Sequence, residues 1–363
     1  MKLVCTADWH VYSFQEFSKQ LLVSWENSTN RFVVDPNGKE MNSRLFNILD
    51  GICDIRDFCI EHDIKYILNA GDIFHKRGVI QVEAFNALCL VLKSIKDSNL
   101  TSIMVAGNHD QVDSSISPET SIHTLDRYAT VIESPQVLEI DGISIICLPY
   151  SSNREFFLNS LYSLMGNIDS TKSIICAHCG VTGAQVGSGS FLMNDEYCLE
   201  DLKYDKFKYV VLGHYHRPQL LSNNTFYCGS PLQNSFSDEL PVDEFGGHNG
   251  FFVIDTERRW NVEFFPIFKP RFCTVKSPEE ITSDTDFFRL KTTSEEVILA
   301  ESKSENVRIE LEKSYEEVSR SEIDITDSFE SAVTKYALEH NQSQDVVELG
   351  LNILNQAKQM NEV

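Results

Sequence analysis

The stretch "YVVLGHYHRP" (209–218) decides the fold, because it reads as a buried strand that ends in two histidines. Four apolar residues lead into Gly213, and His214 and His216 follow with one tyrosine between them. Residues two apart in an extended chain can share one side, and histidine is the commonest metal-ligating side chain. The pair taken alone fits a metal site or an ordinary polar loop, so the rest of the chain has to distinguish them.

Five short apolar runs in the sequence stop abruptly at polar clusters. They are "KLVCTADWH" (2–10), "YILNAGDIFH" (66–75), "SIMVAGNHD" (102–110), "SIICAHCG" (173–180) and "YVVLGHYH" (209–216). Their Val, Ile and Leu content without strict alternation suits strands that are covered on both faces. A small residue precedes each polar cluster: Ala7, Gly71, Gly107, Ala177 and Gly213. Small residues let backbone and ligand crowd around one point, so the five runs predict one shared site.

Helix-like stretches at 43–62 and 81–97 separate the first three runs, with apolar residues recurring at spacings of three and four. Strand–helix–strand order implies right-handed crossovers in a layered domain. We therefore expect an α/β fold, an α+β sandwich of layered sheet with flanking helices. In open α/β sheets the chemistry gathers at the carboxyl ends of the strands, where all five clusters lie.

The polar residues at these strand ends form one candidate set. It consists of Asp8, His10, Asp72, His75, Asn108, His109, Asp110, His178, His214 and His216. Carboxylate, imidazole and amide ligands together suit Mn²⁺, Fe²⁺ or Zn²⁺ rather than Ca²⁺ or Mg²⁺. The donors are too many for one ion, whereas two ions bridged by a carboxylate make the hydrolytic site used on phosphate esters. The remaining four histidines are expected on the surface or in loops: His62, His123, His248 and His340.

The motif order DxH, GDxFH, GNHD, H and GHxH resembles that of the calcineurin-like metallophosphoesterases over roughly residues 1–270. The histidine of "GDIFH" and the closing "GHYH" look like the SbcD subunit of SbcC–SbcD double-strand-break nucleases, including the phage recombination-nuclease versions. Monoester phosphatases of the wider family tend to carry an Asp–Arg pair after the glycine–aspartate, where this chain has "GDIFHKRG" (71–78). The resemblance thus favours the nuclease branch.

The resemblance implies a role for each member of the candidate set. Asp8, His10 and His216 are expected on one metal ion, Asn108, His178 and His214 on a second, and Asp72 between both. The cofactors implied are two divalent ions, with Mn²⁺ preferred. His109 matches the catalytic histidine that contacts the phosphate and donates a proton, Asp110 is expected to orient it, and His75 to position the DNA backbone.

Composition limits the other classes of function. The formal charge of −23 and pI near 4.8 argue against independent nucleic-acid binding through a basic face. They do not exclude a nucleic-acid enzyme, because bound divalent cations change the local field and a partner can supply basic surface. No apolar run reaches the length of a membrane span. The start "MKLVCTADWH" reaches Asp8 too soon for a signal peptide, so a cytoplasmic location is expected. The resemblance implies a bacterial cell, with a phage-encoded version as the alternative.

The ten cysteines are expected to be reduced, and most to be buried in apolar patterns. Cys176 and Cys179 in "CAHC" mimic half of a zinc site, but no second pair lies at a matching spacing. We therefore do not expect a zinc site there.

Three segments are expected along the chain: a metallophosphoesterase nuclease domain at 1–270, a capping domain at 271–325 and C-terminal helices for partner docking at 326–363. Residues 271–363 carry 10 basic and 20 acidic side chains, so negative charge is denser there than before. Residues 328–340 and 345–358 have amphipathic helical patterns. The helices fit a docking element or simple packing on the parent domain.

Two stretches depart from the family pattern. Residues 11–44 replace a short loop and contain "VVDPNGKE" (33–40), which looks like a hairpin turn. This insertion is expected to be a passive surface element, with contact to DNA or a second subunit as the alternative. The glycine- and serine-rich "GVTGAQVGSGSF" (180–191) fits a substrate lid or a plain connector equally well.

The leading hypothesis is a two-metal DNA exonuclease/endonuclease subunit in DNA repair or recombination. The resemblance implies an SbcC-like coiled-coil ATPase as partner, double-stranded DNA ends as substrate, and a homodimer within a heterotetramer, without a membrane. A phosphomonoesterase or nucleotide phosphatase is one alternative, and a non-catalytic repair scaffold is another. The scaffold is disfavoured because every expected ligand position is filled.

Overall fold

The computed structural model describes residues 1–166, 168–187, 191–192, 197–241, 245–292, 305–311 and 328–360 of the 363-residue chain. Two compact units are present, Met1–Glu310 and Leu311–Val363. The candidate set lies entirely in the first unit.

The first unit contains two six-stranded sheets, and the first sheet holds three of the five predicted strands. Its order is β17 (Asn261–Pro266), β16 (Gly250–Asp255), β1 (Lys2–Thr6), β5 (Tyr66–Asn69), β6 (Thr101–Val105) and β7 (Thr130–Ile132). The four strands from β1 to β7 are parallel, and β16 pairs antiparallel with β1. The carboxyl ends of β1, β5 and β6 therefore lie at one edge.

The second sheet holds the other two predicted strands. Its order is β14 (Gln219–Leu220), β15 (Thr225–Tyr227), β13 (Tyr209–Gly213), β10 (Ser173–His178), β9 (Ile143–Leu148) and β8 (Gln136–Ile140). Strands β9, β10, β13 and β15 are parallel, and the register pairs His178 with Gly213. The polar residues that end β10 and β13 are thus level with each other.

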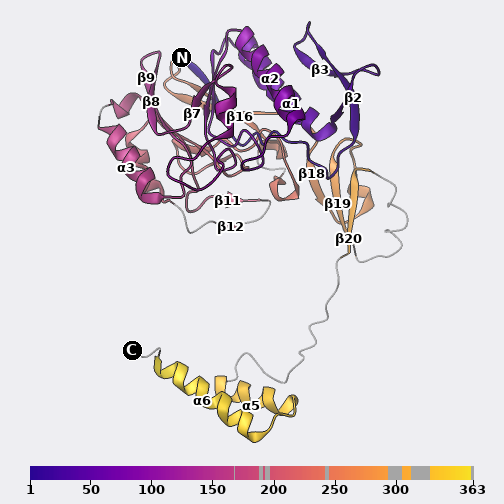
Figure 1. Ribbon diagram of the computed structural model, residues 1–363, viewed down its shortest axis with the longest axis vertical. Helices are drawn as coiled ribbons and strands as arrows, with labels where there is room; N and C mark the ends of the chain where they lie inside the picture. Colours follow the sequence, from indigo (N-terminus) through magenta and orange to yellow (C-terminus); the bar gives the residue numbers. More distant parts are fainter. Residues whose placement is uncertain are drawn as a thin grey trace. The chain divides into compact units, whose positions relative to one another are not determined.

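The two sheets pack face to face, and helices cover their outer faces (Figure 1). Leu3 and Cys5 of the first sheet share a buried cluster with Cys147 and Val211 of the second. The alternate residue Val4 packs instead with helices α1 (Ser43–Glu61) and α2 (Val82–Asp97). On the other side, the second sheet packs against α3 (Arg154–Met165). The predicted α/β sandwich, with strands covered on both faces, is confirmed.

The free cysteines fit this packing. All ten are free, and Cys5, Cys147, Cys176 and Cys228 lie in the cluster between the sheets. Cys179 belongs to the cluster under α3 instead. Cys176 and Cys179 therefore face different sides of the second sheet, which agrees with the expectation that they do not form a zinc site.

The 11–44 insertion forms a small sheet of its own, with β2 (Gln20–Glu26) between β3 (Arg31–Val34) and β4 (Lys39–Asn42). The expected turn is present, because the amide of Gly38 donates to the carbonyl of Asp35 at 2.8 Å. The strands on either side of this turn both pair with β2 and not with each other. The predicted hairpin across "VVDPNGKE" is therefore wrong in its pairing.

The insertion is anchored to α1. The Arg31 guanidinium contacts Asp50, Asp54 and Asp57, each at 2.6–2.7 Å. At its end, the side chain of Asn42 accepts from the backbone amides of Arg44 and Leu45 and so caps α1.

Another small sheet follows residue 270, in the order β18 (Phe272–Val275), β19 (Phe287–Thr292) and β20 (Val307–Leu311). Phe272 and Phe287 pack with Phe236 and with Phe17 of the insertion. The sheet thus shares an aromatic cluster with two segments of the first 270 residues. That residues 271–325 act as a capping domain stays a prediction, and residues 293–304 and 312–327 lie outside the described residues.

Within the 180–191 stretch, β11 (Gln185–Val186) pairs with β12 (Phe191–Leu192). Residues 188–190 lie outside the described residues, so the choice between lid and connector stays open as predicted.

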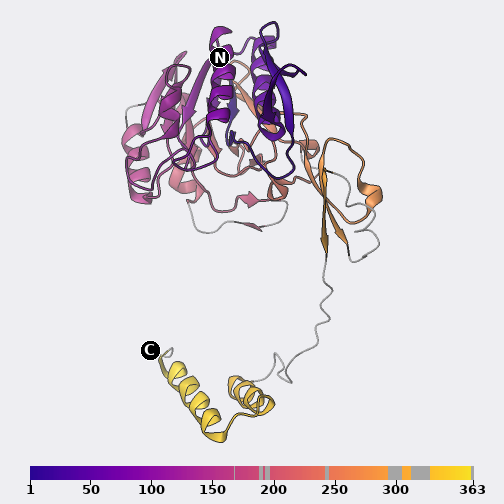
Figure 2. The same ribbon diagram turned by 45° about the vertical axis from the view of Figure 1, so that its right-hand side comes forward.

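The described residues of the second unit form two helices, α5 (Phe329–Glu339) and α6 (Gln344–Met360), which lie against each other (Figures 1 and 2). They match the predicted helices at 328–340 and 345–358 closely. In the parts of the chain that the structure describes, no helix is both long and apolar enough to cross a membrane.

Candidate metal centre

Two backbone loops, after β1 and after β5, are bound together in an unusual conformation. Asp8, His10 and Asp72 have φ of 53°, 45° and 55°, a region that L-residues rarely adopt. The amide of Asp8 donates to the carbonyl of Gly71 at 2.8 Å, and the amide of His10 to that of Asp72 at 3.1 Å. Such conformations cluster at functional sites and persist because neighbouring contacts enforce them. Here they turn three candidate side chains toward one place.

Two of the small residues before the motifs, Gly71 and Gly107, have side-chain atoms of the site so close to them that no Cβ fits. A Cβ on Gly107 would lie 2.1 Å from Oδ1 of Asp72, and one on Gly71 would lie 2.2 Å from Nδ1 of His178. Both distances are far below a van der Waals contact, so only glycine fits. The prediction that small residues let the strand ends crowd around a common point is explained by these two contacts.

Asp8, His10 and His216 form the first group of side chains that can hold a metal ion. Their donor atoms lie within 4.8 Å of one another, and the Nε2 atoms of His10 and His216 are 2.9 Å apart. Asp8 and His10 are buried. A carboxylate and two imidazole nitrogens facing one point are typical ligands of a first-row transition metal.

The amide oxygen of Asn108 gathers the second group. It lies 2.9 Å from Nε2 of His178 and 3.1 Å from Nδ1 of His214. The Asp72 carboxylate stands between the two groups, because its Oδ2 is 3.5 Å from Nε2 of His178 and 3.8 Å from Nε2 of His10. This position is the one that a bridging carboxylate requires.

The backbone after β13 separates the two histidines that opened the sequence analysis. β13 ends at Gly213, and His214 has φ of 117°, so the pair does not lie on an extended strand as first considered. The amide of His214 donates to the Asp8 carboxylate at 3.1 Å. Tyr215 is buried in the cluster under α3. His214 and His216 consequently face different groups because of this turn.

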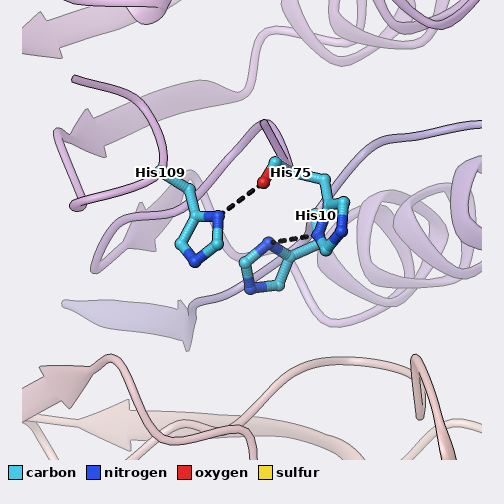
Figure 3. A group of neighbouring side chains, drawn as sticks. All are labelled: His10, His75 and His109. Carbon is cyan, nitrogen blue, oxygen red and sulfur yellow. Dashed lines mark hydrogen bonds between the residues drawn. The ribbon is translucent and has the colours of Figure 1, made fainter. Parts of the chain in front are cut away.

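His75 and His109 lie beside the first group (Figure 3). Their rings are stacked, with centroids 5.7 Å apart and 19° between planes. Nδ1 of His109 bonds the carbonyl of His75, which leaves Nε2 of His109 4.0 Å from Oδ2 of Asp72. Nδ1 of His75 lies 3.4 Å from Nδ1 of His10. The side chain of His109 is 37% exposed, so a substrate can reach it.

Asp110 contacts backbone amides of two loops. Its buried carboxylate accepts from the backbone amides of Ile73, Phe74 and Gly107 at 3.0–3.2 Å. The ring of His109 is held by the carbonyl of His75 instead. Asp110 therefore ties the loop after β5, which carries the His75 carbonyl, to the loop after β6, and that it orients His109 stays a prediction.

Two residues near the site were missed in the sequence. Asp238 accepts from Nδ1 of His216 at 3.0 Å. The capping pattern of "SFSD" (235–238) indicates a tight turn. It does not indicate that this turn lies next to His216. Tyr150 follows β9 and lies about 6 Å from the rings of His178 and His214. Nothing in its local sequence indicates this position.

The four other histidines lie outside the two groups. His62, His123 and His340 are exposed, and His248 is half-buried beside Phe268.

Burial and the charges of neighbouring side chains shift the pKa values of several residues of the site. Burial raises the pKa of Asp8 to about 6, although His178 and His216 offset part of this effect. Burial lowers the pKa of His214 to about 3. It also lowers that of His178, but the charge and hydrogen bond of Asp72 outweigh it and raise the pKa to about 9. Clustered perturbations of this kind are typical of functional sites. A cation held by Asp72 and His178 competes with that proton.

A cleft of about 460 Å³ opens beside the two groups. Its lining includes His75, His214 and His216 together with Phe14 and Arg44. The donor set fits divalent metal ions on its own chemistry, since oxygen and imidazole nitrogen atoms converge on two neighbouring points beside a cleft that admits a ligand.

Comparison with known proteins agrees with this geometry. Residues 1–218 match the Calcineurin-like phosphoesterase family, so the chain belongs to this family, whose members are hydrolases that bind two divalent metals. It is 27% identical over 230 residues to the DNA double-strand break repair protein Mre11 of Methanocaldococcus jannaschii, covering 58% of this chain and 59% of that protein. It is 24% identical over 273 residues to the protein of the same name from Saccharolobus solfataricus, covering 72% of this chain and 66% of that one.

The matches thus span about three fifths to two thirds of the length of these relatives. Among solved structures, a dimetal phosphatase from Danio rerio matches 70% of this chain and 92% of that one at 9% identity, with a TM-score of 0.36.

We predict that Gly107→Ala abolishes binding of divalent metal ions without unfolding the protein, because the new methyl group would displace the Asp72 carboxylate. Elemental analysis after gel filtration measures the metal content, and circular dichroism measures the fold. Gly166→Ala is the control, since a Cβ at that helix cap would meet its nearest neighbour at an ordinary 3.5 Å. A Gly107→Ala protein with the wild-type metal content would show that Asp72 can move without loss.

Proposed function

We propose that this chain is the nuclease subunit of an SbcD-type DNA repair or recombination complex, which hydrolyses phosphodiester bonds with two divalent metal ions. The convergence of six metal-ligand candidates on Asp72, with His75 and His109 at the open side, carries the proposal. The relatives named as double-strand break repair proteins support the nuclease branch of the family.

In this proposal Asp8, His10 and His216 hold one ion, Asn108, His178 and His214 hold the other, and Asp72 bridges them. When bound, two such ions supply a hydroxide nucleophile and neutralise the charge that develops on the phosphate. Mn²⁺ is the proposed ion, because imidazole makes up four of the seven ligands.

His109 is proposed to act on the phosphate rather than on an ion. Its Nδ1 is taken up by the carbonyl of His75, so Nε2 is the atom that faces the centre. From there it can contact a phosphate oxygen and carry a proton to the leaving oxygen. His75 lies outside both groups of proposed ligands, next to the ring of Phe14 in the cleft, where it can contact the DNA backbone.

A phosphomonoesterase of the same family is the second candidate, since the two ions would serve either ester. "GDIFHKRG" in place of the Asp–Arg pair of monoesterases favours the nuclease. A non-catalytic scaffold has no reason to keep strained backbone at Asp8, His10 and Asp72, so this geometry speaks against it.

The deciding assay gives the purified protein a linear DNA duplex and a phosphomonoester side by side, each with Mn²⁺ or with Mg²⁺. We expect cleavage of the duplex with Mn²⁺ and weak or no cleavage with Mg²⁺, because imidazole ligands disfavour Mg²⁺. Hydrolysis of the monoester without attack on DNA would identify the protein as a phosphatase instead.

Two substitutions separate the proposed roles. His109→Ala is expected to keep both Mn²⁺ ions but to lower cleavage about 10²–10⁴-fold, the usual share of a general acid. Asp72→Ala is expected to lose metal and activity together, because this carboxylate serves both ions. Elemental analysis and duplex cleavage measure the two effects, and His123→Ala, an exposed histidine paired with Glu133, is the control. Loss of metal from His109→Ala would contradict its assignment.

The proposed partner is an SbcC-like ATPase with a long coiled coil, and the proposed substrate is a double-stranded DNA end, acted on in the cytoplasm. The net charge of −23 supports an arrangement in which the partner binds the duplex and this chain cleaves it. An acidic nuclease repels DNA phosphates, so its affinity for DNA alone is expected to be low. The resemblance also implies a homodimer within a heterotetramer. Exposed apolar side chains that follow the GDIFH and GNHD motifs would suit such an interface: Val79, Val82, Val112 and Ile116.

The two C-terminal helices are the proposed docking element. Val347 of α6 lies in the groove between the helices, where Gly350 approaches Val333 of α5. Leu349 and Ile353 of α6 are 59% and 58% exposed, so the hairpin leaves a second apolar face open. Such a face fits a helix of a coiled coil.

We predict that Leu349→Glu with Ile353→Glu abolishes co-purification with the co-expressed ATPase while metal content and basal nuclease activity stay at the wild-type level. Removal of residues 328–363 is expected to have the same effect. Asn352→Glu with Asn355→Glu adds the same charge at exposed polar positions of α6 and is the matched control. Full co-purification of the truncated chain would show that docking lies elsewhere.

A further inference from the structure

The proposed metal ligand His216 has a carboxylate behind it. Nδ1 of His216 lies 3.0 Å from Oδ1 of Asp238, on the side of the ring away from Nε2. The side chain of Asp238 is 9% exposed, so water screens this contact little. His178 differs, because its Nδ1 bonds the neutral carbonyl of Ala70 at 2.8 Å. The two groups of ligands thus have different support.

Asp238 is held rigidly on its other side. Its Oδ2 accepts from the backbone amides of Asn234 at 2.8 Å and Ser235 at 3.2 Å. The carbonyl of Asn234 accepts from Arg44 at 2.8 Å, and the Arg44 guanidinium lies 4.7 Å from the ring centre of Phe272 in β18. The carboxylate therefore cannot turn away from His216 without breaking these bonds.

The backbone of His216 is fixed as well. Its carbonyl accepts from the amide of Ser230 at 3.0 Å and from the side chain of Asn249 at 3.2 Å. With both the backbone and Nδ1 held, the ring can present only Nε2 to the first group, where it lies 2.9 Å from Nε2 of His10.

We propose that Asp238 is a positioning residue of the metal centre: it keeps the proton of the His216 ring on Nδ1, so that the lone pair of Nε2 faces the ion. This inference rests on the proposed two-metal function. A carboxylate behind a ligating imidazole also makes the ring a stronger ligand. Asp238 thereby strengthens binding of the ion held by Asp8, His10 and His216. The affinity for the other ion is unaffected.

Asp238→Asn tests the proposal, because it keeps the shape and reverses one hydrogen bond. The amide oxygen is needed by the two backbone amides, so the NH₂ group faces Nδ1 of His216. The NH₂ group and the Nδ1–H of His216 are both donors and cannot form a hydrogen bond with each other. The ring therefore carries its proton on Nε2, so that Nδ1 can accept from the NH₂ group. Nε2 then has no lone pair for a metal ion.

The measurement is titration of the metal-free full chain with Mn²⁺, with free Mn²⁺ followed by electron paramagnetic resonance. We expect two sites in the wild type, and in Asp238→Asn a loss of about 10–100-fold in affinity at one of them only, the usual effect of such a partner. Ser235→Ala removes the other side chain that caps the same turn, the hydroxyl that accepts from the amide of Ser237. Asp169→Asn removes one negative charge at a remote exposed turn. Both controls are expected to keep the wild-type affinities.

A second measurement needs no variant. In the wild-type protein loaded with diamagnetic Zn²⁺, nuclear magnetic resonance of ¹⁵N-histidine is expected to show a proton on Nδ1 of His216 that exchanges slowly with water. Its absence would overturn the proposal, as would unchanged affinities in Asp238→Asn or an equal loss in Ser235→Ala. A wild-type protein that binds no Mn²⁺ would instead contradict the proposed metal centre itself.

Discussion

The carboxylate of Asp72 has to lie between two groups of imidazole and amide donors, and the architecture of the first unit follows from this constraint. Its Oδ2 is within 4 Å of ring nitrogens of both His10 and His178, which come from different sheets. The two sheets, which pack face to face, must therefore have the carboxyl ends of their parallel strands on the same side. The glycine at 107 is the direct result, since any larger residue would occupy the place of the carboxylate.

Strain and burial accompany this arrangement. Asp8, His10 and Asp72 adopt left-handed backbone conformations and are buried, an unfavourable combination for charged groups. The cross-bonds between the loops after β1 and β5, together with the Asp110 carboxylate that accepts three backbone amides, hold the loops in place. The site is pre-formed by the protein, which is the condition for binding ions in a fixed geometry.

Support for the centre comes from residues outside the five motifs as well. Asp238 links His216 to the turn at 234–238, and Arg44 links that turn to β18. The insertion at 11–44 contributes to the same region, because Phe17 joins the aromatic cluster of Phe236, Phe272 and Phe287. A segment expected to be a passive surface element thus packs into the structure that surrounds the cleft. Its contact with DNA or a second subunit stays a hypothesis.

The sequence by itself determined the five strand ends, the helices between the first three, and the residues that gather at the site. It could do so because strands buried on both faces and small residues before polar clusters leave local patterns that need no partner to be recognised. It also predicted both C-terminal helices from their amphipathic spacing. The strands β8 and β9 and helix α3, by contrast, were not singled out, since their patterns carry no motif.

Only the tertiary structure decided how the strands divide between two sheets and which atoms meet. The turn at His214, with φ of 117°, sends His214 and His216 to different groups, and a spacing of two residues cannot reveal it. The roles of Asp110 and Asp238 depend on backbone amides and a ring nitrogen that come from distant segments of the chain. Contacts of this kind leave no periodic signal, because the partners are brought together by the pairing and packing of strands that are far apart in the sequence.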